Sequence, residues 1–223
     1  GLAEENVEFK ITKSLANKHT ARCIILVSPD AERTMNTYLG VSQELTEEDV
    51  DLNIIEESSI LYLEGYLWDL DNAKKAIKKS ISTAINSETK IAFSISDAFC
   101  VDRFREEFID LVNNSADLIF ANESEIKSLF ETNELNDAIK KCQDTKKIFA
   151  VTLGDKGAKI IYKNEVIDIK AEVINKLVDT TGAGDLFAAG FLAEYLKTQD
   201  LELSGKQGVK MASIIIQQFG ARI

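Results

Sequence analysis

The chain has 223 residues, of which 45% are hydrophobic, and it carries a formal net charge of −11 at pH 7. This length and apolar content are enough for one sizeable α/β domain with a true core. The acidic balance argues against nucleic acid and against an anionic membrane surface as partners, because both repel a negatively charged protein. A small molecule is therefore the expected partner.

Histidine and cysteine content narrows the chemistry further. His19 is the only histidine, which excludes any metal site built from several histidines. It lies in the polar run "NKHTAR", which is typical of a solvated loop, so we expect no His-based triad either. The cysteines, Cys23, Cys100 and Cys142, stand far apart without a C-x-x-C pair, so we expect reduced thiols in a cytoplasmic protein. We expect no membrane helix, because no apolar run reaches the roughly 20 residues of a span. We also expect no signal sequence, because no basic stretch followed by an apolar one opens the chain. Catalysis would then rest on carboxylates, backbone dipoles or a bound ion.

Residues 1–45 are expected to form a distinct N-terminal region. Two runs rich in β-forming residues, 21–28 and 33–41, are joined by the turn sequence "PDAE", in which Pro29 presets φ and Asp30 can bond the backbone. This pattern predicts a β-hairpin.

From residue 46 to 223 the pattern changes to an alternation of strands and helices. We predict strands at 60–68, 90–96, 117–121 and 147–154, a β-hairpin at 158–169, and helices at 71–85, 97–114, 183–198 and about 203–219, with two shorter helices between 122 and 142. Strands that alternate with helices at this spacing imply right-handed crossovers and a mostly parallel sheet covered on both faces. The region is predicted to be a single α/β core.

The sequence "TTGAGD" at 180–185 runs directly into an apolar helix. We expect the helix to begin near Gly182 or Ala183, which leaves the N–H groups of Ala183, Gly184 and Asp185 without intrahelical partners. A phosphoryl group could approach these amides closely and would meet the positive end of the helix dipole. Asp185 would then accept the proton of an attacking hydroxyl. The alternative is a plain helix start, in which a threonine is the cap and the carboxylate only favours the dipole.

Three motifs resemble those of one enzyme family. "DTTGAGDLFAAGF" at 179–191 resembles the D-T-x-G-A-G-D motif of the phosphofructokinase-B (PfkB, ribokinase-like) carbohydrate and nucleoside kinases. "NESE" at 122–125 and "VTLGDKGA" at 151–158 resemble the family's N-x-x-E and T-x-G-x-x-G motifs. Their order along the chain argues against a chance match. The sequence contains no Walker lysine motif that could bind phosphate instead. The resemblance implies a ribokinase-like, doubly wound, mostly parallel sheet with a small β lid.

The resemblance also implies an activity, namely ATP-dependent phosphorylation of a hydroxyl group on a sugar or a nucleoside, with Mg²⁺. Asp185 would be the catalytic base, and Gly182, Ala183 and Gly184 would form the anion hole. Asp179 would help to hold the monovalent cation, such as K⁺, that many members contain, although a plain strand end also fits this residue.

The other two motifs would serve the nucleotide. Asn122 would bind ATP and Glu125 would organise Mg²⁺, largely through water, although an N-cap with its capping-box carboxylate fits the same residues. Thr152 and Gly154 would approach the ATP phosphates and Gly157 would shape their loop, although a hairpin turn also fits.

The predicted hairpin resembles the lid strands of the bacterial adenosine-kinase-like branch, as do "YLEGYLWD" and "SISDAFCVDRFREEF". This favours adenosine or another ribonucleoside over a free sugar as acceptor. Arg22 and Arg33 are the candidate cations of the lid, with surface salt bridges as the alternative. Lid strands of the family often pair between subunits, so a homodimer is expected.

One departure from the family pattern is large. Family members carry a further N-terminal part, with an acidic substrate ligand and a Gly-Gly segment, which this sequence lacks, so we expect the chain to be N-terminally incomplete. An inactive fragment that binds nucleotide or a partner is therefore the alternative function. A dinucleotide-dependent oxidoreductase is disfavoured, because no G-x-G-x-x-G follows the early strands.

Overall fold

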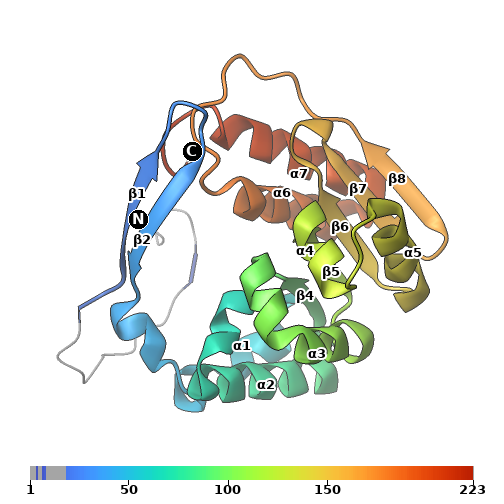
Figure 1. Cartoon of the computed structure of the whole chain (residues 1–223). Coiled ribbons are helices and arrows are strands. Elements are labelled where there is room, and N and C mark those ends of the chain that lie inside the picture. The colour runs from blue at the N-terminus through green and yellow to red at the C-terminus, as the bar shows by residue number, and fades with distance from the viewer. Residues whose placement is uncertain (1–3, 5–6, 9–18, 223) are drawn as a thin grey trace.

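The structure is a computed structural model that describes residues 4, 7–8 and 19–222. Its strands form two separate sheets (Figure 1). The smaller sheet is the hairpin of β1 (Arg22–Val27) and β2 (Arg33–Tyr38), which pair antiparallel, so the predicted hairpin is confirmed. It stands apart from the larger sheet and reaches the loop that leads into the last two helices (Figure 1).

The larger sheet has six strands in chain order. The first four strands run parallel to one another, and each of the last two pairs antiparallel with the strand before it. The strands are β3 (Ile60–Glu64), β4 (Lys90–Ser94), β5 (Leu118–Asn122), β6 (Ile148–Thr152), β7 (Ala158–Tyr162) and β8 (Glu165–Ile169). The mostly parallel α/β sheet predicted from the sequence is therefore confirmed. Because β3 to β6 run parallel, their carboxyl ends lie along one edge of the sheet.

Helices cover both faces of this sheet (Figure 1). The helices are α1 (Leu52–Glu57), α2 (Asp71–Asn86), α3 (Ala98–Asn114), α4 (Glu123–Leu129), α5 (Leu135–Thr145), α6 (Ala183–Thr198) and α7 (Leu201–Ile215). Buried residues of α1 to α5 form one hydrophobic cluster with the sheet, and buried residues of α6 and α7 form a second cluster on the other face. Alternation along β4 supports both clusters, since Ile91 and Phe93 join the first and Ala92 joins the second.

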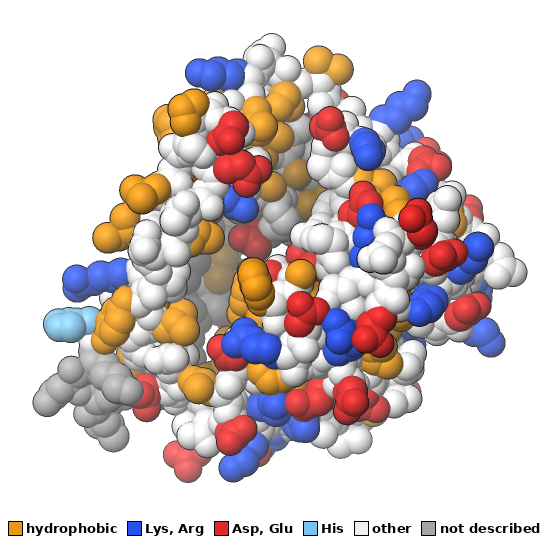
Figure 2. Space-filling model, viewed as in Figure 1, with side chains coloured by type: hydrophobic (Ala, Val, Ile, Leu, Met, Phe, Trp, Pro, Cys, Tyr) orange, Lys and Arg blue, Asp and Glu red, His pale blue; other side chains and the backbone are white. Residues whose placement is uncertain are grey.

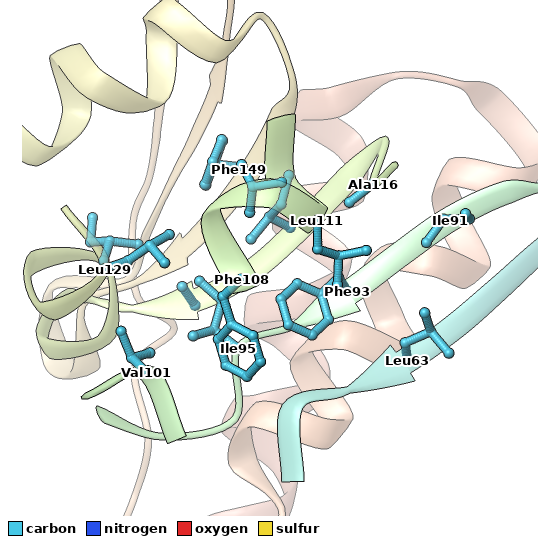
Figure 3. Close-up of a cluster of buried hydrophobic side chains, with 14 of the residues drawn as sticks. Leu63, Ile91, Phe93, Ile95, Val101, Phe108, Leu111, Ala116, Leu129 and Phe149 are labelled. Carbon is cyan, nitrogen blue, oxygen red and sulfur yellow. The ribbon is translucent and has the colours of Figure 1, made fainter. Parts of the chain in front are cut away.

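Aromatic side chains anchor the first cluster (Figure 3). Phe108 of α3 is fully buried and meets Phe93 edge to face, with ring centroids 5.1 Å apart. Trp68 packs against the same ring at 5.8 Å, and its indole N–H donates to Glu107 Oε2. This packing fixes α3 against the sheet and so holds the β4–α3 loop at the carboxyl edge.

Several predicted strands end earlier than expected: those predicted at 33–41 and 90–96 end at Tyr38 and Ser94. The strand predicted at 60–68 ends at Glu64, and residues Gly65–Asp69 form a short 3₁₀ helix. A Cβ at Gly65 would lie 2.7 Å from the Ile95 carbonyl oxygen. At this position the chain therefore approaches the β4–α3 loop more closely than any side chain larger than that of glycine would allow. The strand predicted at 147–154 likewise ends at Thr152. Among the described residues, no helix is long and apolar enough to cross a membrane.

Candidate active site

The "TTGAGD" turn starts α6 at a glycine in the left-handed conformation. Gly182 is the N-cap residue, with φ of +79°. The Ala183 N–H donates to the Thr180 carbonyl at 3.2 Å, and Leu186 is the first residue of α6 whose N–H reaches the Gly182 carbonyl, at 2.9 Å. In the part of the chain that the structure describes, the N–H groups of Gly184 and Asp185 have no acceptor. Of the three amides that we expected to be unpaired, the Ala183 amide is therefore hydrogen-bonded within the turn, and only the Gly184 and Asp185 amides are left without an acceptor among the described residues.

The space around these two amides is open. A Cβ built on Gly184 would meet no atom within 4 Å, whereas one on Gly182 would lie 3.0 Å from the Ala221 Cβ. Gly184 and Asp185 are both exposed. An anion can thus approach the Gly184 and Asp185 amides from outside the helix, along the direction in which the helix dipole is positive.

A pocket of about 380 Å³ adjoins this turn. Thr152, Gly154 and Gly157 line it from the β6–β7 connection, while Ala183 and Gly184 line it from α6. Its remaining wall is largely apolar and comes from the loop after β8 and from α6 and α7, including Ile174, Leu177, Phe187, Val209 and Ile216. The fold thus brings together two motifs that are 30 residues apart in the sequence.

The two glycines of the β6–β7 connection differ in what surrounds them. Gly154 has φ of +62°, is exposed, and has no atom within 4 Å of a built Cβ. Gly157 has φ of +91°, and a Cβ there would lie 2.1 Å from the Ile169 carbonyl oxygen. Gly157 is therefore needed for the close approach of the chain to the end of β8, while Gly154 leaves its backbone accessible to a ligand.

Asn122 and Glu125 form a complete capping box at the start of α4. The Asn122 side-chain oxygen accepts from the Glu125 N–H at 2.9 Å. In return, Glu125 Oε2 accepts from the Asn122 N–H at 2.9 Å and Oε1 accepts from Asn122 Nδ2 at 2.5 Å. Burial raises the pKa of Glu125 to about 7, an effect that the Asn122 N–H opposes and the Asp97 charge increases.

This geometry limits how the pair can hold a metal ion. Both Glu125 oxygens already accept hydrogen bonds, and only 7% of the residue is exposed. Across the described residues, no group of three or more carboxylate, thiol or imidazole side chains is arranged to hold a metal ion. The pair therefore fits a contact to Mg²⁺ through water better than direct coordination.

Two residues that sequence reasoning missed lie near Asp185. Glu64 ends β3 at the carboxyl edge, and burial together with the Asp185 charge raises its pKa, while the Tyr62 hydroxyl lowers it. Burial and then the Glu64 charge raise the pKa of Tyr62 to about 12. The available signal was a carboxylate at the end of a buried apolar strand, in "ILYLE".

Exposed aromatic side chains lie along the same edge. Tyr66 follows β3 and is 54% exposed, and Phe99 in the first turn of α3 is 78% exposed. Both flank Ser96, which has a left-handed φ of +75°. The Ser96 hydroxyl accepts from the Tyr66 N–H at 3.2 Å, and its carbonyl accepts from the Tyr66 hydroxyl at 3.3 Å. The strained loop thus fixes an aromatic ring at the surface.

Asp179 is the most enclosed carboxylate of the site, with 3% of the residue exposed. Burial raises the pKa of this carboxyl, but hydrogen bonds from Thr181 and Gly220 and the charge of Arg33 outweigh burial, and the net shift is downward. Asp179 is thus ionised and held by groups of the chain itself.

The hairpin touches the loop before α6 through its turn. Ala31 is 4% exposed, and its carbonyl oxygen lies 3.5 Å from the Thr180 hydroxyl, which donates to it. Arg33 follows this turn, while Arg22 lies at the opposite end of the hairpin, paired with Tyr38. Figure 2 shows that the surface is hollowed between the hairpin and the body of the molecule, and that charged side chains lie in the hollow.

Comparison with known proteins confirms the ribokinase-like fold that the resemblance implies. The model of the pfkB family of carbohydrate kinases matches residues 1–223. The crystal structure of an adenosine kinase from Sinorhizobium meliloti is 41% identical, with a TM-score of 0.95, over 100% of this chain and 68% of that one. A probable sugar kinase from Rhizobium etli is 42% identical, also with a TM-score of 0.95, over 99% of this chain and 67% of that one. A putative sugar kinase from Pyrococcus horikoshii is 30% identical over 99% of this chain and 70% of its own length.

The two glycines of the β6–β7 connection should respond differently to alanine. We expect Gly157→Ala to lower the free energy of unfolding by on the order of 3 kcal/mol, because its φ and its contact with β8 both exclude a Cβ. Gly154→Ala should cost only about 1 kcal/mol, the penalty for a left-handed alanine in open space. Urea denaturation of both variants measures the difference, and equal losses would contradict it.

The raised pKa of Glu125 predicts that the free energy of unfolding falls as the pH rises. The folded state keeps the proton up to about pH 7, whereas the unfolded chain releases it near pH 4.5, so the charge of Glu125 lowers stability as pH rises between these values. Relative to wild type, Glu125→Gln should gain on the order of 3 kcal/mol in unfolding free energy between pH 4.5 and pH 8.

The control for this prediction is Glu123→Gln in the same helix turn. Lys127 lowers the pKa of Glu123, so Glu123 is charged in both states over most of the range and its substitution should change little with pH. Denaturant unfolding at several pH values measures both. The same pH profile for the two variants would show that Glu125 is not protonated by burial.

Proposed function

The chain belongs to the pfkB family of carbohydrate kinases, and from that premise we propose that it transfers the γ-phosphoryl group of ATP to a hydroxyl group of a nucleoside. Its family is one of kinases, and its relatives include an adenosine kinase and a probable sugar kinase. The observation that carries the proposal is the pair of unpaired amides at Gly184 and Asp185, open to a ligand beside an apolar pocket.

Asp185 is the proposed base. Its carboxylate takes the proton of the acceptor hydroxyl as the acceptor oxygen forms a bond to the γ-phosphorus and the bond from that phosphorus to the β,γ-bridging oxygen breaks, releasing ADP. The Gly184 and Asp185 amides donate to the oxygens of the transferring group and stabilise the charge that develops there. Gly182 sets this geometry through its left-handed conformation, and Ala183 contributes through the turn rather than through its own amide.

The pocket beside the turn is the proposed nucleotide site. A volume of about 380 Å³ with mainly apolar walls suits the base of ATP. Thr152 and the accessible backbone of Gly154 line this pocket together with Gly184, so the phosphates would extend past them toward the Gly184 amide. Gly157 acts on this site indirectly, by fixing the loop that carries Gly154.

Mg²⁺ is the proposed metal partner of ATP, and Asn122 and Glu125 would hold it through water. When bound, the ion would neutralise charge on the β- and γ-phosphate oxygens. The capping box fixes the Glu125 carboxylate at the end of β5, next to the strand that carries Thr152. This position lets the carboxylate orient water without surrendering its hydrogen bonds to Asn122.

A nucleoside acceptor is favoured over a free sugar by the aromatic groups of the acceptor side. Glu64, near Asp185, can accept hydrogen bonds from the hydroxyls of any sugar ring. Tyr66 and Phe99 add exposed aromatic surface at the same edge, which suits stacking against the π-face of a nucleobase. The free sugar stays the second candidate because the Rhizobium etli relative is described as a probable sugar kinase.

A homodimer through the hairpin is also proposed. Ile24 and Leu26 of β1 are 66% and 59% exposed, and Tyr38 of β2 is 52% exposed. Ile24 and Leu26 alternate along β1, so they lie on one face of the hairpin, and Tyr38 belongs to the same face through its pairing with Arg22. Apolar side chains gathered on one face of an exposed hairpin suit contact with a second copy.

Loss of the Asp185 carboxylate should slow phosphoryl transfer but leave nucleotide binding intact. We expect Asp185→Asn to lower kcat by about 100-fold or more, the scale of losing a positioned base, with little change in the ATP dissociation constant. ADP release with adenosine as acceptor and calorimetric titration of an ATP analogue measure the two quantities.

Glu202→Gln is the matched control, because Glu202 also lies in the first turn of a helix, α7, where it pairs with Lys206 on the surface. It should leave kcat unchanged. Wild-type turnover by Asp185→Asn would refute the assigned base. Absence of turnover in the wild type with both nucleosides and sugars would instead favour the alternative of a nucleotide-binding protein without catalysis.

The choice of acceptor is tested by two substitutions on the acceptor side. Phe99→Ala should raise KM for a nucleoside but leave KM for ribose unchanged, because only the nucleoside carries a base that can stack. Glu64→Gln should raise KM for both acceptors, since it weakens contacts to sugar hydroxyls that both share. Steady-state kinetics with adenosine and ribose measure these effects, and an equal effect of Phe99→Ala on both acceptors would overturn the nucleoside assignment.

A further inference from the structure

The Asp179 carboxylate is surrounded by donors from its own chain. Oδ1 accepts from the Thr181 N–H at 2.9 Å and from the Thr181 hydroxyl at 2.6 Å. Oδ2 accepts from the Gly220 N–H at 3.0 Å. Because only 3% of the residue is exposed, these donors take the place of water around the charge.

These surroundings do not fit the monovalent cation that the family resemblance implies at Asp179. A hard cation binds oxygen lone pairs, whereas the groups that point at this carboxylate present the hydrogens of N–H and O–H bonds. Positive charge is already supplied from the hairpin, since the Arg33 charge acts on Asp179. The carboxylate is thus satisfied within the chain.

The donors of Asp179 come from segments that converge on the "TTGAGD" turn at 180–185, called the anion-hole turn below. Gly220 belongs to the chain segment after α7, and the next residue, Ala221, packs against Gly182. The Val178 and Asp179 N–H groups donate to the Ile216 carbonyl at 2.8 and 3.3 Å, which ties the end of α7 to the same loop.

The hairpin reaches the loop at the neighbouring residue. The Thr180 hydroxyl donates to the Ala31 carbonyl at 3.5 Å, and Arg33 lies two residues beyond Ala31. Asp179 and Thr180 thus join the anion-hole turn to the hairpin on one side and to the segment after α7 on the other. Displacing either contact would change how the turn that carries Gly184 and Asp185 is held.

We propose that Asp179 is a positioning residue that clamps the segment after α7 onto the anion-hole turn, next to the Thr180 contact with the hairpin turn, and that this clamp works without a bound monovalent cation. The catalytic consequence rests on the proposed function, because it concerns the orientation of the Gly184 and Asp185 amides. The clamp itself concerns only contacts within the chain, so it can be measured without turnover.

Hydrogen exchange at the Gly220 amide tests the clamp directly. We expect this amide to be protected to the same degree in KCl and in tetramethylammonium chloride of equal ionic strength, because its acceptor is the buried carboxylate. Asp179→Ala should lose the protection in both salts, since the Gly220 N–H then has no side-chain acceptor at residue 179. Protection that requires K⁺, or protection that survives in Asp179→Ala, would overturn the proposal.

Thr181 variants provide a second test that preserves the carboxylate. Thr181→Val removes one donor to Asp179 and should lower kcat by about 10-fold, the effect of a misplaced catalytic turn, with KM for ATP unchanged. Thr181→Ser restores the hydroxyl and should restore kcat. An unchanged kcat in the Val variant, or a Ser variant as slow as the Val variant, would overturn the positioning role, whereas absent turnover in the wild type would contradict the proposed function and leave the exchange result standing.

Discussion

The site depends on how α6 begins. A helix cannot supply acceptors for its own first N–H groups, and most helices satisfy them with a side-chain cap or with water. Here the N-cap is Gly182, which has no side chain and adopts a left-handed φ, so the amides of Gly184 and Asp185 stay unpaired and exposed. A bound anion is the natural partner for such amides. The proposed base, the proposed nucleotide pocket and the proposed clamp around Asp179 are all arranged around this turn.

The parallel sheet determines which segments of the chain lie on the same side of the molecule as this turn. Because β3, β5 and β6 end on the same edge, Glu64, Asn122 and Thr152 come from three distant parts of the chain to one side of the molecule. The hairpin closes the other side through Ala31 and Arg33. Acceptor, nucleotide and transferring group can thus be handled by separate segments that share only the edge of the sheet and the start of α6.

Local sequence predicted the elements better than it predicted the contacts between them. The hairpin, the mostly parallel sheet and the start of α6 followed from alternation, turn residues and glycine spacing, because these are local preferences. Glu64, Tyr66 and Phe99 were not found, since only the fold brings residues 64–66, 96–99 and 185 to one edge. The roles of Asn122 and Glu125 could not be decided from sequence, because the same residues serve a capping box and a water-mediated metal contact.

The proposed function depends on the Gly184 and Asp185 amides holding the transferring phosphoryl group. Amide NMR of the labelled protein can test this contact by comparing Mg²⁺-ADP with a non-hydrolysable Mg²⁺-ATP analogue that differs in the γ-phosphoryl group. We expect downfield shifts of the Gly184 and Asp185 amide protons with the ATP analogue alone, because only it carries γ-phosphoryl oxygens for these amides to bind. Identical spectra at these two amides with both nucleotides would show that they do not hold the transferring group.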